Sequence, residues 1–203
     1  MPKYHDICLK NTSSEVCQKA QEIGWNTTNC SLNTVFLEAE NWGELKKKIN
    51  SHRKEADVLV FKGGNEELNR KACQNNKLDI LLHPEKGRKD PGINHIMAEE
   101  AAQNNTAIGL DLTQLNQNGK KRTHILSHWR KILKLCEKYN TPYLITTAAE
   151  KKHQLRAPRE LKALIDSIGY SGKKAVAETP GKIIRNAEKS EKDECIRPGV
   201  EKK

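Results

Sequence analysis

Basic side chains that could bind phosphate groups occur in three short strings of the sequence. These strings contain Arg88-Lys89, Lys120-Lys121-Arg122, and the pair Arg156 and Arg159. Ammonium and guanidinium groups bind the phosphate oxygens of a nucleic-acid backbone and hold a protein in place without reading the base sequence. We interpret these seven residues as candidate nucleic-acid contacts and add Lys62, Arg70 and His95, which lie outside the three strings. The ten candidates are Lys62, Arg70, Arg88, Lys89, His95, Lys120, Lys121, Arg122, Arg156 and Arg159.

Structural roles compete with phosphate binding at some of these positions. Arg70 could form an ion pair with Glu66 or Glu67 at helical spacing. Asn94 is expected to cap the helix that follows it, and His95 could equally be a partly buried histidine with satisfied hydrogen bonds. The sequence leaves both readings of Arg70 and of His95 open.

Arg156 and Arg159 lie on either side of Pro158, a residue type that favours the first position of a helix. The helix dipole opposes cations near a helix N-terminus, so two arginines at this place call for a compensating anion. That anion could be an RNA phosphate or the carboxylate of a buried Asp or Glu.

The positive charge is unevenly distributed along the chain. The 203 residues carry a net charge of +10. Residues 120–162 hold twelve Lys or Arg against three Glu, so nearly all of the excess lies in this window. A block of one sign within folded sequence is typical of a surface that binds a polyanion, although a solvated lysine-rich face would give the same count.

Neither a membrane span nor an export signal is predicted. No apolar run approaches the roughly 20 residues that a spanning helix needs. The first residues, MPKYHDICLK, lack the apolar centre of a signal peptide, so we expect a cytoplasmic protein. The six cysteines have no CxxC spacing, which argues against a zinc site, and we predict that they are free thiols.

Short apolar runs alternate with amphipathic segments along the chain. Residues 57–61 (DVLVF), 78–82 (LDILL), 107–112 and 143–147 are predicted strands, and the more polar residues 26–32 could form another. The longest predicted helix covers residues 124–139, with apolar residues on one face and lysines on the other. Strands that alternate with helices in this way imply parallel βαβ units.

The fold class that we predict is α/β, with a TIM-barrel-like (β/α) arrangement that is slightly truncated against the usual eight units. It would form one domain over residues 1–189. Residues 190–203 are charged and poor in apolar side chains, and we predict a disordered tail there. In such folds the loops after the strands carry functional residues, and these loops here cover residues 62–65, 83–94, 113–124 and 147–159.

Three strings of the sequence resemble the ribonuclease P protein component 3 family. They are residues 56–112, which include KGGNEELNR, DILLHP and RKDPGINH, residues 122–149, and residues 155–169, which read LRAPRELKALIDSIG. The combination is specific, although no single piece is. The resemblance is close over residues 56–169 and weaker at both ends.

This resemblance implies a fold, a function and partners. The family is known for a TIM-barrel-like fold related to the polymerase-and-histidinol-phosphatase (PHP) metal hydrolases. It implies a protein subunit of ribonuclease P that binds the catalytic RNA with protein component 2 and other subunits. The complex removes 5′ leaders from precursor tRNA. Because the RNA would supply the chemistry and bind the Mg²⁺ ions, we expect no cofactor and no catalytic residue on the isolated chain.

A metal-dependent phosphoesterase of the PHP kind is the alternative. Such an enzyme needs several His and Asp or Glu ligands around its metal ions. Ile7 stands where the second histidine of an HxH pair would lie, and residues 147–149 (TAA) stand where an Asp-x-His pair would lie. His83, which directly follows the predicted strand of residues 78–82, stays a possible metal ligand. His124 and His128 have i,i+4 spacing without the Glu of HExxH, so we predict no metal site.

Overall fold

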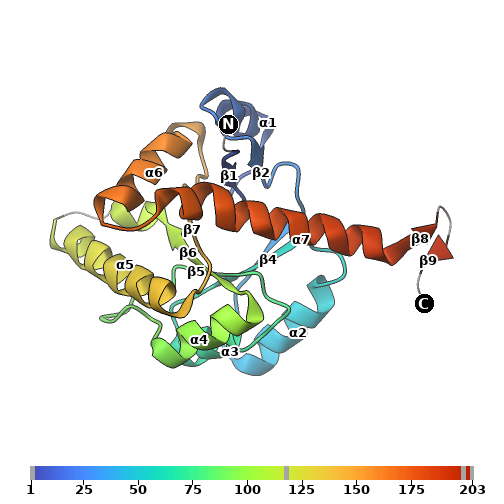
Figure 1. Ribbon diagram of the computed structural model, residues 1–203, viewed down its shortest axis with the longest axis horizontal. Helices are drawn as coiled ribbons and strands as arrows, with labels where there is room; N and C mark the ends of the chain where they lie inside the picture. Colours follow the sequence, from blue (N-terminus) through green and yellow to red (C-terminus); the bar gives the residue numbers. More distant parts are fainter. Residues whose placement is uncertain (1–2, 117–118, 198–199, 202–203) are drawn as a thin grey trace.

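The computed structural model describes the backbone of residues 3–116, 119–197 and 200–201, and the side chains of these residues as far as 189. Parallel strands form its centre (Figure 1). Strands β3 to β7 pair in sequence order, and β1 pairs with β2. The parallel strands are β1 (His5–Asp6), β2 (Thr27–Thr28), β3 (Thr34–Leu37), β4 (Val58–Lys62), β5 (Ile80–Leu82), β6 (Ala107–Asp111) and β7 (Tyr143–Thr146).

The two ladders meet at the side chain of Asp6. Its carboxylate accepts hydrogen bonds from Oγ1 of Thr146 (2.5 Å) and from Oγ1 and the backbone N of Thr147 (2.6 and 2.9 Å). Just beyond β1, the backbone N–H groups of residues 10 and 11 donate to the carbonyl of Ala149. Strand β1 therefore lies beside β7, and the strands curve into an incomplete barrel, which confirms the predicted truncated barrel.

Helices surround this barrel (Figure 1). The α-helices are α1 (Ser14–Glu22), α2 (Trp42–His52), α3 (Glu66–Cys73), α4 (His95–Asn104), α5 (Lys120–Tyr139), α6 (Pro158–Ser167) and α7 (Thr179–Glu194). Shorter helical segments are η1 (Leu112–Asn116), η2 (Lys152–Gln154) and η3 (Lys174–Glu178). Asn41, Asn65 and Asn94 begin α2, α3 and α4, because each side chain accepts a hydrogen bond from the backbone N–H three residues on.

Alternation along the strands separates the apolar residues into two clusters. One side packs against the surrounding helices and includes Leu59, Phe61, Leu81, Ile108 and Ile145. The other side faces the barrel interior, where Ile183 and Ile184 of α7 fill the space between the strands. The interior cluster consists of Ile7, Cys8, Val58, Val60, Ile80, Leu82, Ala107, Leu144, Ile183 and Ile184.

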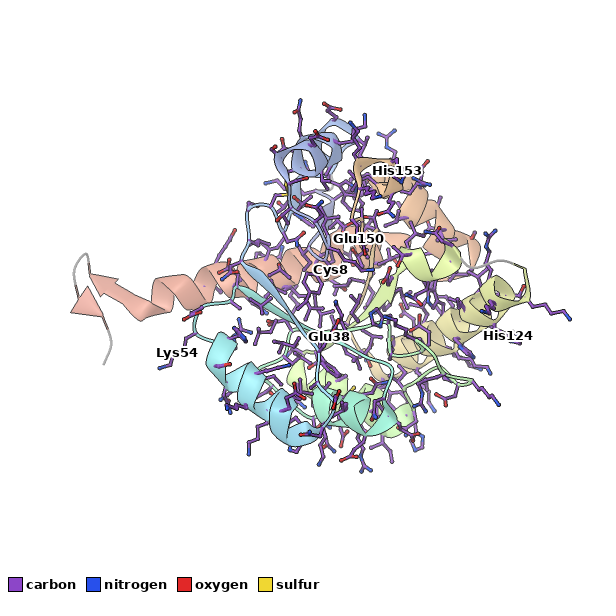
Figure 2. All side chains as sticks on the ribbon, turned by 180° about the vertical axis from the view of Figure 1, so that it is seen from behind. Cys8, Glu38, Lys54, His124, Glu150 and His153 are labelled. Carbon is purple, nitrogen blue, oxygen red and sulfur yellow. A yellow bond between two sulfur atoms is a disulfide. The ribbon has the colours of Figure 1, made fainter. Side chains whose placement is uncertain are left out.

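Helix α7 therefore closes the barrel interior from one side. It contacts β1, β4 and β7 and crosses the strands as the long helix of Figure 1. Cys8, which is fully buried, lies near the middle of the fold in Figure 2. Within the described residues, no helix is both long and apolar enough to cross a membrane.

Several predicted boundaries differ from the structure. The strand predicted over residues 26–32 shortens to β2, and β3 was not predicted. The four residues of β3 are too short to show a clear alternation, and three of them are only half-buried at the edge of the sheet. Helix α7 runs through the beginning of the predicted tail and is followed by β8 (Cys195–Arg197) and β9 (Val200–Glu201). Disorder of the tail in solution stays a prediction.

The prediction that all cysteines are free thiols was wrong for Cys17 and Cys30. These two residues form a disulfide across a separation of 13 residues, with their Cα atoms 6.0 Å apart. The bond links α1 to the segment after β2, a proximity that only the folded chain reveals. Cys8, Cys73 and Cys136 are free and buried.

Candidate nucleic-acid interface

Two cavities lie among the loops that follow the parallel strands. The first has a volume of about 760 Å³ and is lined by Glu85, Lys86, Gly87, Arg88, Lys89, Gln114, Lys121, His124, Ile125 and His128. The second has a volume of about 330 Å³ and is lined by Leu112, Thr113, Leu115, Asn116, Thr147, His153, Gln154 and Arg156. The structure thus brings Arg88 and Lys89 together with Lys121, and places Arg156 at a neighbouring cavity.

The buried side chain of Asn69 holds the loop of the first cavity in place. Its amide donates to the carbonyls of Pro84 (3.0 Å) and Gly92 (2.9 Å), which join the two ends of the loop. Its Oδ1 accepts from the backbone N–H of Gly64, where φ is +130°. Glycine suits this turn, because other residues rarely adopt such a φ. The loop of residues 85–91 therefore has a fixed base.

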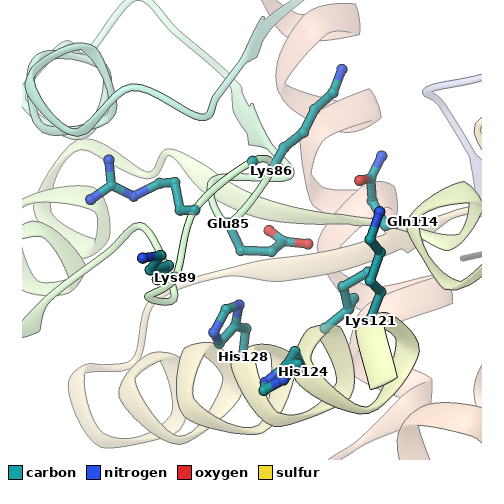
Figure 3. Close-up of a pocket in the computed structure, with 10 residues that line it drawn as sticks. Glu85, Lys86, Lys89, Gln114, Lys121, His124 and His128 are labelled. Carbon is teal, nitrogen blue, oxygen red and sulfur yellow. The ribbon is translucent and has the colours of Figure 1, made fainter. Parts of the chain in front are cut away.

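Glu85 points into the first cavity, between this loop and α5 (Figure 3). Its Oε1 accepts a 2.8 Å hydrogen bond from Nε1 of Trp129, whereas Oε2 has no partner among the described residues. Burial raises the pKa of the Glu85 carboxyl to about 7. Glu85 was not among the residues predicted from the sequence. Its position three residues after β5, in a loop already predicted to be functional, was the available signal.

Arg88 is held by two carboxylates of the protein itself. Its guanidinium donates to Asp90 at 2.8 and 2.7 Å and to Glu66 at 3.0 Å. The hydrogen bond from Arg88 lowers the pKa of Asp90. The charge of Arg88 is therefore largely compensated, and a phosphate would have to compete with Asp90 for the N–H donors of the Arg88 guanidinium. Lys89 is exposed and has no ion pair within the described part of the chain.

The basic cluster of residues 120–122 opens α5, whereas we had predicted a loop that ended at residue 124. Its three cations occupy the first turn of a 20-residue helix that has no acidic residue there. All three are exposed. Arg122 is partly held by the carbonyl of Leu115, to which its Nε donates at 2.8 Å. Cations at this end oppose the helix dipole, so an external anion would be bound favourably here.

Two histidines of α5 face the same cavity. His128 is buried and lines the cavity together with Lys89, and burial lowers its pKa. His124 is exposed one turn earlier and lies beside it in Figure 3. Among the residues whose side chains are described, no group of three or more His, Cys, Asp or Glu could hold a metal ion.

The remaining predicted residues lie apart from the first cavity. Lys62 ends β4 and forms a 2.6 Å ion pair with Glu38. Arg70 is exposed on α3 and, within the described residues, has no ion pair, because Glu66 pairs with Arg88 instead. His95 is exposed at the first position of α4, so the reading of it as a partly buried histidine is wrong.

Arg156 and Arg159 are both exposed near the start of α6. Arg156 donates to the carbonyls of His153 (3.0 Å) and Leu155 (2.8 Å). Neither arginine forms an ion pair in the part of the chain that the structure describes, so the alternative of a buried internal carboxylate is not realised. Glu160 caps the helix through the backbone N of Ala157.

A second set of polar residues is buried where β5, β6 and β7 end. Asp111 is fully buried, accepts from Oγ1 of Thr113, and lies 3.6 Å from Nζ of Lys10. Burial lowers the pKa of His83 to about 4. His83 and Ala148 have φ values of 42° and 45°, a region that non-glycine residues seldom adopt and that is frequent at functional sites.

Comparison with known proteins gives a consistent result. The sequence pattern that defines the family described as RNase P subunit p30 matches residues 3–192 of this chain. Ribonuclease P protein component 3 of Methanothermobacter thermautotrophicus is 36% identical over 157 residues, which cover 75% of this chain and 64% of that protein. The corresponding protein of Methanococcoides burtonii is 36% identical, covering 87% of this chain and 82% of its own length.

The fold also matches a solved structure. A chain in the cryo-EM structure of archaeal ribonuclease P with mature tRNA superposes with a TM-score of 0.76 and 32% sequence identity. The match covers 98% of this chain and 86% of that chain. The likeness therefore includes the incomplete barrel and the helices around it.

Proposed function

Because this chain belongs to the RNase P subunit p30 family, we propose that it is a protein subunit of ribonuclease P, an endoribonuclease that removes 5′ leaders from precursor tRNA. Its partners would be the catalytic RNA, protein component 2 and other protein subunits, with precursor tRNA bound in the assembled enzyme. The solved structure that it matches is a ribonuclease P with mature tRNA. The place of action would be the cytoplasm.

The observation that carries the RNA-binding role is a set of exposed cations at one edge of the barrel without internal carboxylate partners. Lys89, Lys121 and Arg156 line the two cavities there, Lys120 precedes Lys121, and Arg159 lies three residues after Arg156. We refer to these five residues and Arg122 as the basic edge. Cations that the protein leaves unpaired are available to phosphates, and their binding releases counterions from the RNA.

Lys62 and Arg88 would play a smaller part in this interface, since carboxylates of the protein already compensate them. Arg70 and His95 are accessible but lie outside both cavities. We therefore rank the basic edge above these four residues as the RNA contact.

The chemical step would belong to the RNA and its Mg²⁺ ions, with no cofactor on the protein. The hydrogen bonds of Asp6 support this proposal. A carboxylate at the end of the first strand could in principle bind a metal ion, but both oxygens of Asp6 accept hydrogen bonds from Thr146 and Thr147. A carboxylate used in this way joins two strands instead of presenting oxygens to an ion.

Salt-dependent binding of the catalytic RNA by the full chain tests the RNA-binding role. The variant Lys120→Glu/Lys121→Glu/Arg122→Glu should bind more weakly and lower the slope of log Kobs against log salt by about one for each lost phosphate contact. The matched control is Lys46→Glu/Lys47→Glu/Lys54→Glu, which reverses three exposed charges on and after α2. Lys54 lies at the opposite side of the molecule from His124 in Figure 2.

Equal losses in the two triple variants would show that net charge, and not the basic edge, determines binding. Such a result would contradict the proposed interface.

A further inference from the structure

We propose that the first cavity accommodates one unpaired RNA nucleotide, whose phosphate contacts the lysine rim and whose base presents an amino group to Glu85. This inference rests on the proposed function, because it requires RNA at the basic edge. It adds a base-reading site to an interface that otherwise contacts only the RNA backbone.

The rim of the cavity provides the phosphate contacts. Lys86, Lys89 and Lys121 line it, all three are exposed, and none forms an ion pair within the described residues. They come from two segments, the loop after β5 and the first turn of α5, and they surround the same opening (Figure 3). Lys121 also lies at the positive end of the helix dipole, which adds to the attraction for a phosphate.

The floor of the cavity provides an acceptor that the protein itself leaves unused. Glu85 is 3% exposed, and its Oε2 has no hydrogen-bond partner among the described residues. An unsatisfied buried carboxylate oxygen is costly, so a donor brought by a ligand would remove that cost. The donor must be an N–H or O–H group that reaches past the lysine rim.

The walls of the cavity suit a flat ring. His124 and His128 present imidazoles from successive turns of α5, and Ile125 adds an apolar surface between them. Unstacked RNA bases commonly stack on aromatic side chains, histidine included. The volume of about 760 Å³ lies within the range of sites that bury small organic ligands.

The chemistry of a single carboxylate oxygen discriminates between bases. Adenine, cytosine and guanine carry exocyclic amino groups that can donate to Oε2 of Glu85. Uracil has only its N3–H, which lies between two carbonyl oxygens that would face the carboxylate. The site should therefore prefer an amino-bearing base to uracil.

The indole N–H of Trp129 is a direct reporter, because it is hydrogen-bonded to the other oxygen of Glu85. The full chain, labelled with ¹⁵N in its three tryptophans, would be titrated at about pH 8, where the Glu85 carboxyl is ionised, with the 5′-monophosphates of adenosine, cytidine, guanosine and uridine. Trp25→Phe and Trp42→Phe variants assign the resonance. We expect the Trp129 signal to shift, with roughly tenfold tighter binding of the three amino-bearing nucleotides than of the uridine nucleotide.

Two variants test separately what Glu85 at the floor and the lysines at the rim contribute to nucleotide binding. Glu85→Gln keeps the volume and a hydrogen-bonding group but offers an amide that can also donate to a uracil carbonyl, so it should abolish the preference. Lys89→Ala/Lys121→Ala should weaken the binding of all four nucleotides to a similar degree. Lys46→Ala, an exposed lysine of α2, is the matched control and should change neither property.

Three results would overturn the proposal. The first is a Glu85→Gln protein that is folded, as judged by its thermal midpoint, and keeps the wild-type base preference. The second is a Trp129 resonance that none of the four nucleotides shifts. The third is a shift caused by an acidic peptide alone, which would assign the cavity to a protein segment. If any of these occurred while Lys120→Glu/Lys121→Glu/Arg122→Glu still lost RNA affinity, the proposed function would stand without the nucleotide site.

Discussion

The indole Nε1 of Trp129 donates a 2.8 Å hydrogen bond to Oε1 of Glu85, between residues 44 positions apart in the sequence. Both side chains are buried. The bond fixes the loop that carries Lys89 to the helix that carries Lys121. His128 of the same helix and Lys89 of the loop line one cavity. Two basic strings that are distant in the sequence thereby form one surface.

Replacing Trp129 by Phe should reveal this bond as a pH-dependent stability loss. The variant leaves a buried carboxylate without its donor and creates a small cavity, at a combined cost of about 2–4 kcal/mol. The cost should be larger at about pH 8 than at about pH 5, because an ionised Glu85 suffers more from losing a donor. Urea unfolding monitored by circular dichroism measures it.

Trp25→Phe is the control for that experiment. The indole of Trp25 is also buried but donates to the carbonyl of Arg156, which does not titrate. Its cost should be the same at both pH values. If the two tryptophan variants showed the same pH dependence, the Trp129–Glu85 bond would not have the role given to it here.

The raised pKa of Glu85 predicts how stability changes with pH. Burial raises this pKa from 4.5 to about 7, so the folded protein keeps a proton that the unfolded chain has released between these values. The stabilisation by that proton is fully present below about pH 4.5 and is lost as the pH rises through about 7. Because glutamine does not ionise, the Glu85→Gln variant does not lose stability in this way.

Between about pH 5 and about pH 8, the free energy of unfolding of Glu85→Gln should therefore rise relative to wild type by roughly 2.5 kcal/mol. Chemical denaturation across this range gives the difference directly. Parallel stability curves for the two proteins would mean that Glu85 titrates normally in the folded state.

Asp90→Asn should strengthen RNA binding. Asp90 holds the guanidinium of Arg88 through two hydrogen bonds, and an amide at this place no longer compensates its charge, which leaves the exposed carboxylate of Glu66 beside it. Arg88 then becomes available to phosphate, and the slope of log Kobs against log salt should steepen by about one. Glu99→Gln, which removes one exposed negative charge from α4, is the control. Equal gains in both variants would attribute the effect to net charge alone.

The disulfide between Cys17 and Cys30 should contribute to stability under oxidising conditions. It closes a loop across 13 residues, and loops of this size give about 2–3 kcal/mol. A thiol reductant should lower the thermal midpoint of the wild-type protein to that of Cys17→Ser/Cys30→Ser and leave the variant unchanged. A wild-type midpoint that does not respond to reductant, with six titratable thiols, would show that the bond does not form in solution.

Much of the fold was predictable from local patterns. The buried strands β4 to β7 are apolar runs, and Asn41, Asn65 and Asn94 mark helix starts by cap chemistry. Strand β3 could not be recognised, because its pairing with β4 is a tertiary property that four residues, three of them half-buried, do not encode. The Cys17–Cys30 bond depends in the same way on contacts between distant segments.

The charged residues of the candidate site could be predicted from the sequence, but the contacts among them could not. The sequence indicated Arg88, Lys89 and Lys121 by residue type and by their positions after strands. It could not show that Asp90 and Glu66 compensate Arg88, since that pairing depends on the folded loop. Glu85 was not predicted, because an isolated acidic residue looks ordinary in the sequence. Its burial and its unpartnered oxygen are known only from the structure.

Reconstituted cleavage of precursor tRNA tests the central claim most directly. The reaction would contain the catalytic RNA, protein component 2 and this protein, as wild type, as Lys120→Glu/Lys121→Glu/Arg122→Glu, or as Lys46→Glu/Lys47→Glu/Lys54→Glu. We predict that the wild type and the second triple variant stimulate cleavage at similar concentrations, whereas the basic-edge variant needs a much higher concentration and recovers at low salt. Full stimulation by the basic-edge variant at the wild-type concentration and at physiological salt would contradict the account.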